Sequence, residues 1–143
     1  MNSAVSDSAN LERFRSLPLF ADLGDSALRR VVGLVTELQI PAGQILVHAG
    51  DPGAGLFVIE EGTAIVEGRA NLVIEVGPGE FVGELALLVP EATRSARVRA
   101  KSDVRCLAIG ANDFKQLLQD EPQIALAMLP VVAERLWHAR SDA

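Results

Sequence analysis

The sequence predicts a mainly β fold, a sandwich or barrel of short strands, with helices at both ends of the chain. Between Gln44 and Ile109, short alternating or apolar runs are separated by turn signals that often contain glycine, a texture typical of antiparallel sandwiches and barrels. On both sides of this region, apolar residues recur at helical spacing. A length of 143 residues fits one domain, and a hydrophobic content of 49% is enough for a packed core.

The N-terminal part predicts a disordered start followed by a helix. Residues 1–9 are expected to be disordered, and the folded domain is expected to extend over residues 10–143. After a capping sequence at 24–26, one helical face carries four apolar residues, Leu28, Val31, Val32 and Val35. Pro41, Ala42 and Gly43 then end this pattern.

Six runs predict the strands of the central region. They are residues 44–48, 55–59, 63–67, 71–76, 95–100 and 104–109, separated by turns such as G-D-P-G, E-E-G and G-P-G-E. In the run 95–100, Ala96, Val98 and Ala100 share one face, whereas Arg97 and Arg99 point the other way. We therefore expect a solvated face for most of the local basic cluster, which consists of Arg94, Arg97, Arg99, Lys101 and Arg105.

Helical spacing returns after Ile109. Phe114, Leu117 and Leu118 form a short stripe, and Pro122 suits the first turn of a second helix. The apolar face of this second helix is formed by Ile124, Met128, Val131, Val132 and Leu136. Pro130 lies inside it and is expected to kink or break it. The predicted order is therefore helix, β-barrel, helices.

Composition and charge argue against several classes of function. A net charge of −6 disfavours general binding to nucleic acid or to anionic membranes. The N-terminus does not resemble a signal peptide, and the longest apolar run, Ile124 to Ala133, is too short to span a bilayer. We therefore expect a cytoplasmic protein.

The few histidines and the single cysteine argue against a metalloenzyme or a thiol enzyme. A cupin-type metal site would need several histidines, but the chain has only His48 and His138, which are far apart. Cys106 lies in an apolar strand with no histidine nearby in sequence, so we expect it in the core. The sequence thus predicts no metal site, no cofactor and no enzyme activity, although the cupin-type metalloenzyme is kept as an alternative.

The stretch from Gly83 to Ser95 contains the most informative charges. Glu84 stands at the head of an apolar run, and Arg94 follows ten positions later. A helical turn starting at Gly83 would aim free backbone N–H groups at an anion, and glycine permits close approach. The guanidinium of Arg94 would add charged N–H donors, and Ser95 would add a hydroxyl donor. Glu84 would accept a hydrogen bond from a neutral hydroxyl of the same ligand. An anion beside a hydroxyl describes a sugar phosphate.

A simpler interpretation needs no ligand. Glu84 and Arg94 would then form an ion pair at the edge of the sheet, since pairing lowers the cost of burying either charge. Glycine–acid pairs before apolar helices are common, so residue types and spacing alone leave both interpretations open.

The residues F-V-G-E-L-A-L-L and R-S-A-R-V-R-A resemble the phosphate-binding cassette of cyclic nucleotide-binding domains. That family includes the catabolite activator protein and the regulatory subunits of cyclic-AMP-dependent kinase. The resemblance continues through L-P-L-F-A-D-L-G-D-S-A-L and the glycine-punctuated strands upstream, and through D-F-K-Q-L-L downstream, covering about Leu11 to Leu136. It implies an eight-stranded antiparallel β-roll of the jelly-roll type, with N-terminal and C-terminal helices.

The resemblance also implies a role for each residue of the site. Gly83, Leu85 and Ala86 would offer backbone groups to the ligand and its cyclic phosphate. Arg94 and Ser95 would bind the same phosphate, and Glu84 would bind the ribose 2′-hydroxyl. Val66 and Val76 would form part of the pocket wall beside the base. The expected function is a sensor or regulatory module that binds cyclic AMP, or alternatively cyclic GMP. The alternative is an interaction module of this fold that no longer binds nucleotide.

The C-terminal helix is expected to transmit the signal. In the family it closes over the base and often dimerises, so we expect lid movement and a homodimer through this helix. Trp137 would stack on the base, or alternatively pack against the barrel or a second subunit. Arg135 and Arg140 would reach the base or remain solvated. No DNA-binding helix-turn-helix follows in this sequence, so we expect a stand-alone domain, or alternatively a domain cut from something larger, with an effector protein that the sequence does not identify.

Overall fold

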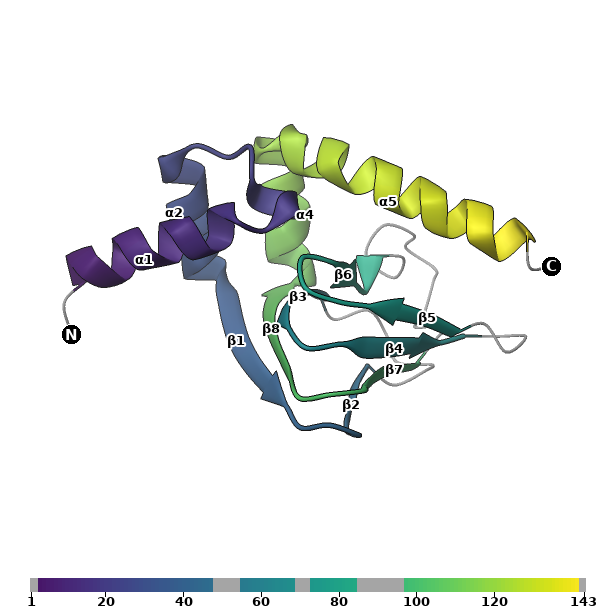
Figure 1. Cartoon of the computed structure of the whole chain (residues 1–143). Coiled ribbons are helices and arrows are strands. Elements are labelled where there is room, and N and C mark those ends of the chain that lie inside the picture. Colours follow the sequence, from purple (N-terminus) through teal and green to yellow (C-terminus); the bar gives the residue numbers. More distant parts are fainter. Residues whose placement is uncertain (1–2, 48–54, 69–72, 85–96, 142–143) are drawn as a thin grey trace. The chain divides into compact units, whose positions relative to one another are not determined.

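The computed structural model describes residues 3–47, 55–68, 73–84 and 97–141 (Figure 1). The chain divides into two compact units. A helical unit contains Met1–Val35 and Gln116–Ala143, and a β unit contains Thr36–Lys115.

The helical unit is built from helical segments that each bury some of their apolar residues. Its elements are α1 (Ser3–Arg15), the 3-10 helix η1 (Pro18–Phe20), α2 (Asp25–Leu34), the end of α4 (Ala111–Asp120) and α5 (Pro122–Ser141). The rings of Phe14 and Phe20 stack with centroids 6.3 Å apart. Ion pairs join Arg15 to Asp25, and Arg30 to Asp120 at 2.6 Å.

α1 begins at Ser3 and thus includes most of residues 1–9, for which the sequence predicts disorder; that expectation stays a prediction. The helix is anchored at its other end, where Leu11 and Phe14 are buried. Once a helix is nucleated, each further residue adds a hydrogen bond at little cost, and residues 3–10 contain neither proline nor glycine. The helix therefore extends back into the polar segment.

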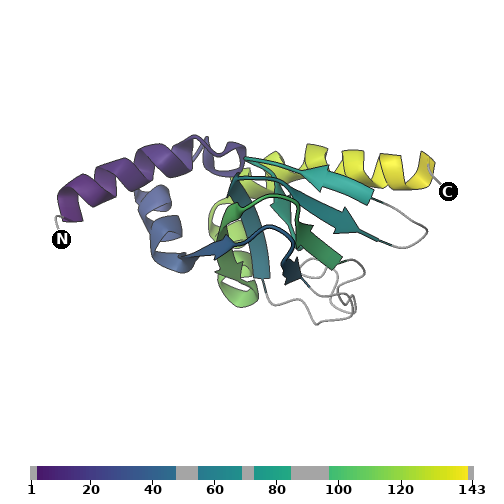
Figure 2. The same cartoon turned by 60° about the horizontal axis from the view of Figure 1, so that its bottom comes forward.

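The β unit contains two four-stranded sheets (Figures 1 and 2). The first has the order β1-β8-β3-β6, formed by Val35–Ile40, Val104–Gly110, Gly55–Glu61 and Phe81–Val82. The second has the order β2-β7-β4-β5, formed by Ile45–Val47, Arg97–Ala100, Ala64–Glu67 and Val73–Val76. The predicted mainly β fold, with eight antiparallel strands and terminal helices, is confirmed for the described part of the chain.

The core of the β unit is formed by residues from both sheets. Ile59, Val82, Val104 and Cys106 come from the first sheet, and Ala64, Val76, Val98 and Ala100 from the second. Val98 and Ala100 are buried whereas Arg97 is exposed, so the predicted faces of this strand are confirmed. Alternation along each strand thus closes the two sheets around one apolar interior.

Two strands were not predicted. β1 follows α2 without a turn, and Val35, expected on the face of that helix, is its first residue. β6 has only two residues and lies where Gly79 and Gly83 interrupt the strand pattern. Both strands depend on pairing with distant segments, which local sequence does not encode.

The C-terminal helices α4 and α5 lie where the spacing predicts them. α5 is one continuous element from Pro122 to Ser141, so of the expected kink or break at Pro130, the break is wrong and the kink stays a prediction. Proline removes a single i to i−4 hydrogen bond, and the buried residues Ile124 and Met128 anchor the helix before it. Among the described residues, no helix is both long enough and apolar enough to cross a membrane.

Candidate functional site

The backbone that leads into Gly83 is tied to the neighbouring strand β3. The amide of Gly79 donates to the carbonyl of Ile59, and the amide of Ile59 donates to the carbonyl of Glu80, both at 2.8 Å. The Glu80 amide closes the turn by donating to the carbonyl of Gly77 at 3.1 Å. The G-P-G-E turn signal predicted this turn, but not its attachment to β3, which fixes the start of β6.

Gly83 lies directly after β6 in a conformation that suits glycine. Its φ angle is +98°, in the region that side chains with a Cβ adopt only at a cost. The preceding residue, Val82, is buried, and the following residue, Glu84, is already helical. The chain therefore changes from strand to helical conformation at this glycine, as expected for a turn that presents backbone amides.

The remaining residues of the predicted cassette lie outside the described residues. These are Leu85, Ala86, Arg94 and Ser95. Their roles, and that of Glu84, remain predictions.

Val66 and Val76 lie on the antiparallel pair β4 and β5, where Val66 is opposite Ile74 and Val76 is opposite Ala64. Val76 is a fully enclosed member of the core that also contains Val82, and Val66 packs against this core. The structure therefore arranges both valines and the end of β6 around one apolar interior. Of the two, the half-buried Val66 has surface left to offer a ligand.

Arg135 and Trp137, the predicted lid residues, lie near the end of α5 in the helical unit. The Trp137 side chain is 69% exposed. The side chain of Arg140 lies outside the described residues.

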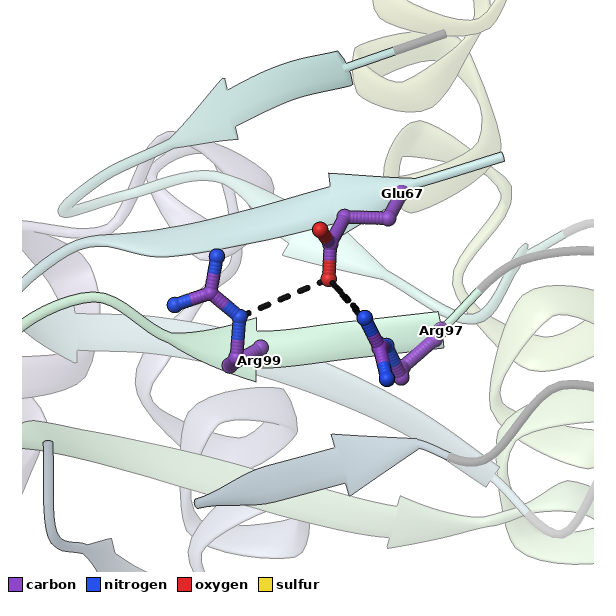
Figure 3. A network of polar contacts seen from close by, with 3 residues as sticks. All are labelled: Glu67, Arg97 and Arg99. Carbon is purple, nitrogen blue, oxygen red and sulfur yellow. Dashed lines mark hydrogen bonds and ion pairs between the residues drawn. The ribbon is translucent and has the colours of Figure 1, made fainter. Parts of the chain in front are cut away.

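The described basic residues of the cluster pair with acids. Glu67 accepts hydrogen bonds from Arg97 at 2.9 and 3.1 Å and from Arg99 at 3.4 Å (Figure 3). The bond from Arg97 is the largest cause that lowers the pKa of Glu67. Lys101 contacts Glu75 at 3.0 Å. These cross-strand pairs place Arg97, Arg99 and Lys101 on the outer face of the sheet, as predicted.

Cys106 is fully buried in the core of the β unit, as predicted. Burial, with a smaller contribution from the charge of Glu60, raises the pKa of its thiol to about 11. A thiol with this pKa remains protonated and unreactive near neutral pH. Within the ranges that the structure describes, no three His, Cys, Asp or Glu side chains are grouped to hold a metal ion.

Comparison with known proteins identifies the family. The sequence family model of the cyclic nucleotide-binding domain matches residues 37–121, a range that includes the whole predicted cassette. The chain is 34% identical over 132 residues to a cyclic nucleotide-gated potassium channel of Mesorhizobium japonicum, covering 92% of this chain and 36% of the channel. It is 33% identical over 121 residues to a cAMP-dependent protein kinase regulatory subunit of Emericella nidulans, covering 82% of this chain and 29% of that subunit.

A solved structure agrees with this assignment. The catabolite activator protein of Thermus thermophilus superposes with a TM-score of 0.72 at 27% identity, covering 87% of this chain and 61% of that protein. The chain thus spans about a third of the length of these two curated relatives. With a family match over residues 37–121 and the fold in agreement, the chain belongs to the cyclic nucleotide-binding domain family.

Proposed function

We propose that the chain binds cyclic AMP through the segment from Gly83 to Ser95 and acts as a regulatory module. The observation that carries this proposal is the left-handed conformation of Gly83 between buried Val82 and helical Glu84. This conformation suits a backbone that accepts an anion at the start of a helical turn.

In this proposal the ligand is held by complementary chemistry at two points. The backbone amides of Leu85 and Ala86 bind the cyclic phosphate together with the Arg94 guanidinium and the Ser95 hydroxyl. Glu84 accepts the hydrogen bond of the ribose 2′-hydroxyl. Val66 contributes apolar surface beside the base, and Val76 supports it from the core.

The preference for cyclic AMP over cyclic GMP rests on two supports. Serine follows the arginine in this chain, as in cyclic-AMP receptors of the family. A relative of 33% identity is named a cAMP-dependent protein kinase regulatory subunit. Isothermal titration with both nucleotides measures the preference directly, and stronger binding of cyclic GMP would reverse it.

Replacement of Arg94 tests the phosphate site. A charged hydrogen bond contributes roughly 1.5–3 kcal/mol, so Arg94→Ala should weaken cyclic AMP binding about tenfold to a few hundredfold. Arg97→Ala is the matched control, because Arg97 lies on the outer face of the sheet beside Glu67. Isothermal titration should therefore show affinity within about twofold of the parent for the control. Equal affinity for Arg94→Ala and the parent would contradict the assignment.

Replacement of Glu84 tests the ribose contact. Glu84→Gln retains an acceptor oxygen, so it should weaken binding less than Glu84→Ala does. The 2′-deoxy analogue should bind the parent poorly, but should be discriminated much less by Glu84→Ala, since a direct contact makes the two losses non-additive. If removal of the hydroxyl costs the same affinity in both proteins, Glu84 does not bind it.

The regulatory signal is proposed to pass through α5. A ligand shifts a conformational equilibrium only by its differential affinity for the two states. We propose that the end of α5, with Arg135 and Trp137, covers the base in the bound state. Trp137 is the only tryptophan and is 69% exposed, so its emission and its quenching by iodide report this movement. If saturating cyclic AMP changes neither signal, α5 does not act as a lid.

The same helix is proposed to join two copies of the chain. The side chains of Ile124 and Met128 are buried, whereas another face exposes apolar residues at spacings of three, four and three. These residues are Leu126, Leu129, Ala133 and Leu136. A 3-4-3 seam is self-complementary, so it suits a second copy of the same helix.

Leu129→Glu tests this dimer, because a carboxylate in the seam would be desolvated. Sedimentation velocity should show a dimer for the parent and a monomer for the variant. Val73→Glu is the control, since Val73 is equally exposed, at 62%, but lies on β5. A monomeric parent, or a dimer that tolerates Leu129→Glu, would contradict the proposal.

A further inference from the structure

A pocket of about 240 Å³ lies at one end of the first sheet. Its lining comes from residues 39–41 at the end of β1, Glu61 at the end of β3, and residues 103–105 at the start of β8. Small-molecule sites usually enclose roughly 300–1,000 Å³. The pocket is therefore sized for one extended side chain or a fragment of similar size.

The walls of the pocket are held together by hydrogen bonds between distant segments. Asp103 Oδ1 accepts from the amide of Ala42 at 2.9 Å, and Ser102 Oγ accepts from the amide of Thr63 at 2.9 Å. Gly62 fits so closely that a Cβ there would lie 2.0 Å from the carbonyl oxygen of Asp103. A pocket with fixed walls loses little entropy when a ligand enters.

A β-bulge lies beside the pocket. In the pairing of β3 with β8, Ile59 is opposite Cys106 and Glu61 is opposite Arg105, so Glu60 is the extra residue. Both consecutive carboxylates consequently reach the same guanidinium. Arg105 Nε lies 3.5 Å from Glu60 Oε1, an ion-pair distance without hydrogen-bond alignment, and Arg105 Nη2 lies 3.0 Å from Glu61 Oε1.

The balance of charge at the pocket is negative. Among the lining residues, the carboxylates of Glu61 and Asp103 outnumber the single positive charge of Arg105. Glu60, which also contacts Arg105, is buried behind this lining. Ile40, Pro41 and Val104 supply apolar surface between these polar groups. Apolar surface beside surplus carboxylate matches a cation on an aliphatic stem, which buries its methylenes and keeps its charge at the rim.

We propose that this pocket binds an alkyl guanidinium or alkyl ammonium group. The group is either that of a free amine or the side chain of arginine or lysine on a partner protein. The charged head lies between Glu61 and Asp103, and the stem lies against Ile40 and Pro41. An anionic ligand is disfavoured, because the carboxylates outnumber Arg105.

This site is separate from the proposed nucleotide site. Val82 pairs with Phe57, so Gly83 continues beyond β6 toward the start of β3, whereas Glu61 is the last residue of β3. The position of β3 that follows this pairing is residue 56, which lies five residues before Glu61. At about 3.3 Å per residue, the distance along the strand is about 16 Å. The cation proposal therefore does not depend on nucleotide binding.

Backbone amide shifts in the NMR spectrum of the full chain provide the test. N-acetyl-arginine-N-methylamide is the probe, and the matched citrulline compound is its neutral isostere. We expect the arginine probe to shift the amides of Ile40, Val104 and Arg105 in a saturable manner, and the citrulline probe to leave them unchanged.

Agmatine is the probe that represents a free amine. Tighter binding of agmatine identifies a free amine as the source of the cation, and tighter binding of the peptide-like probe identifies a partner side chain.

Two variants remove the charges while keeping the shape. Asp103→Asn keeps Oδ1 as the acceptor for the Ala42 amide, and Glu61→Gln changes an exposed side chain. Each should raise the Kd of the arginine probe about two- to fivefold, as expected for partly exposed ion pairs. Glu75→Gln is the control, because Glu75 is an exposed carboxylate paired with Lys101 on the other sheet. It should leave the Kd unchanged.

Several results would overturn the proposal. These are equal shifts with the citrulline probe, an unchanged Kd in the double variant of Glu61 and Asp103, and the absence of saturable shifts at the pocket amides. Thermal unfolding of each variant checks that the fold is retained, so an altered Kd reports the charge and not the loss of the pocket.

Discussion

Gly83→Ala gives a direct test of the turn at the end of β6. The φ angle of Gly83 is +98°, and a residue with a Cβ pays about 1–2 kcal/mol in the left-handed region. If the loop keeps its conformation, this cost lowers stability. If the loop relaxes, the cost appears when the ligand restores the conformation, and the new methyl also blocks close approach to the backbone. We expect cyclic AMP affinity to fall about 5- to 30-fold, the factor that corresponds to 1–2 kcal/mol.

Gly43→Ala is the matched control for this strain. Gly43 has a φ angle of +89°, and no atom lies within 4 Å of the position that its Cβ would take. It lies between β1 and β2, away from the cassette in sequence. Thermal unfolding should show a loss of stability of about 1–2 kcal/mol for this control, and isothermal titration should show unchanged affinity. If Gly83→Ala also binds cyclic AMP as the parent does, the conformation at Gly83 is not part of the site.

Three further predictions concern the β unit. Gly62→Ala should lower the free energy of unfolding in urea by more than Gly43→Ala, since its Cβ would collide with the backbone of Asp103 at 2.0 Å; equal losses would contradict this. The pKa of the Cys106 thiol is raised from 9.0 to about 11, so the unfolded chain loses this proton at a lower pH than the folded protein does. Between these two pH values the parent should therefore lose stability relative to Cys106→Ala, by on the order of 2 kcal/mol. A parallel pH dependence of the two proteins would refute it. Glu67 has a lowered pKa, so its advantage over Glu67→Gln should be present above its unfolded value near 4.5 and disappear as the pH falls through the lower folded value. Chemical denaturation across this range measures the difference, and an advantage that persists in acid would show that the ion pairs are not its source.

The part of the fold that the sequence predicts is the part encoded by neighbouring residues. Alternation in the run 95–100 predicted which side of β7 is buried, and Val98 and Arg97 lie as expected. Helical spacing predicted α4 and α5. The proposed phosphate-binding cassette can be predicted for the same reason, because its residues all fall between Gly83 and Ser95 in the sequence.

The parts that were missed depend on segments far apart in the chain. β6 is a strand because Phe57 and Val58 pair with it, and its own two residues give no periodic signal. The pairing of Arg97 and Arg99 with Glu67 follows from the register of β4 and β7, thirty residues apart. Continuity of α5 across Pro130 was also missed, because a single lost hydrogen bond is offset when residues on the same helix are buried in the core.

The two binding sites proposed for this chain differ in whether their residues are close together or far apart in the sequence. The cassette is local, so composition, residue order and resemblance all point to it from the sequence alone. The pocket joins residues 39–41, Glu61 and residues 103–105, and one extra residue in β3 lies beside it. Without the bulge at Glu60, alternation would direct Glu60 and Glu61 to opposite faces, and only one carboxylate would reach Arg105. A deletion of Glu60 that restores regular pairing should therefore weaken binding of the arginine probe by no more than about two- to fivefold, the range expected for loss of one carboxylate. Cyclic AMP affinity measures whether the change is transmitted along β3, because Ile59, the neighbour of Glu60, also holds the turn that precedes β6. Loss of both activities, in a protein that still unfolds cooperatively, would show that the two sites are coupled through β3.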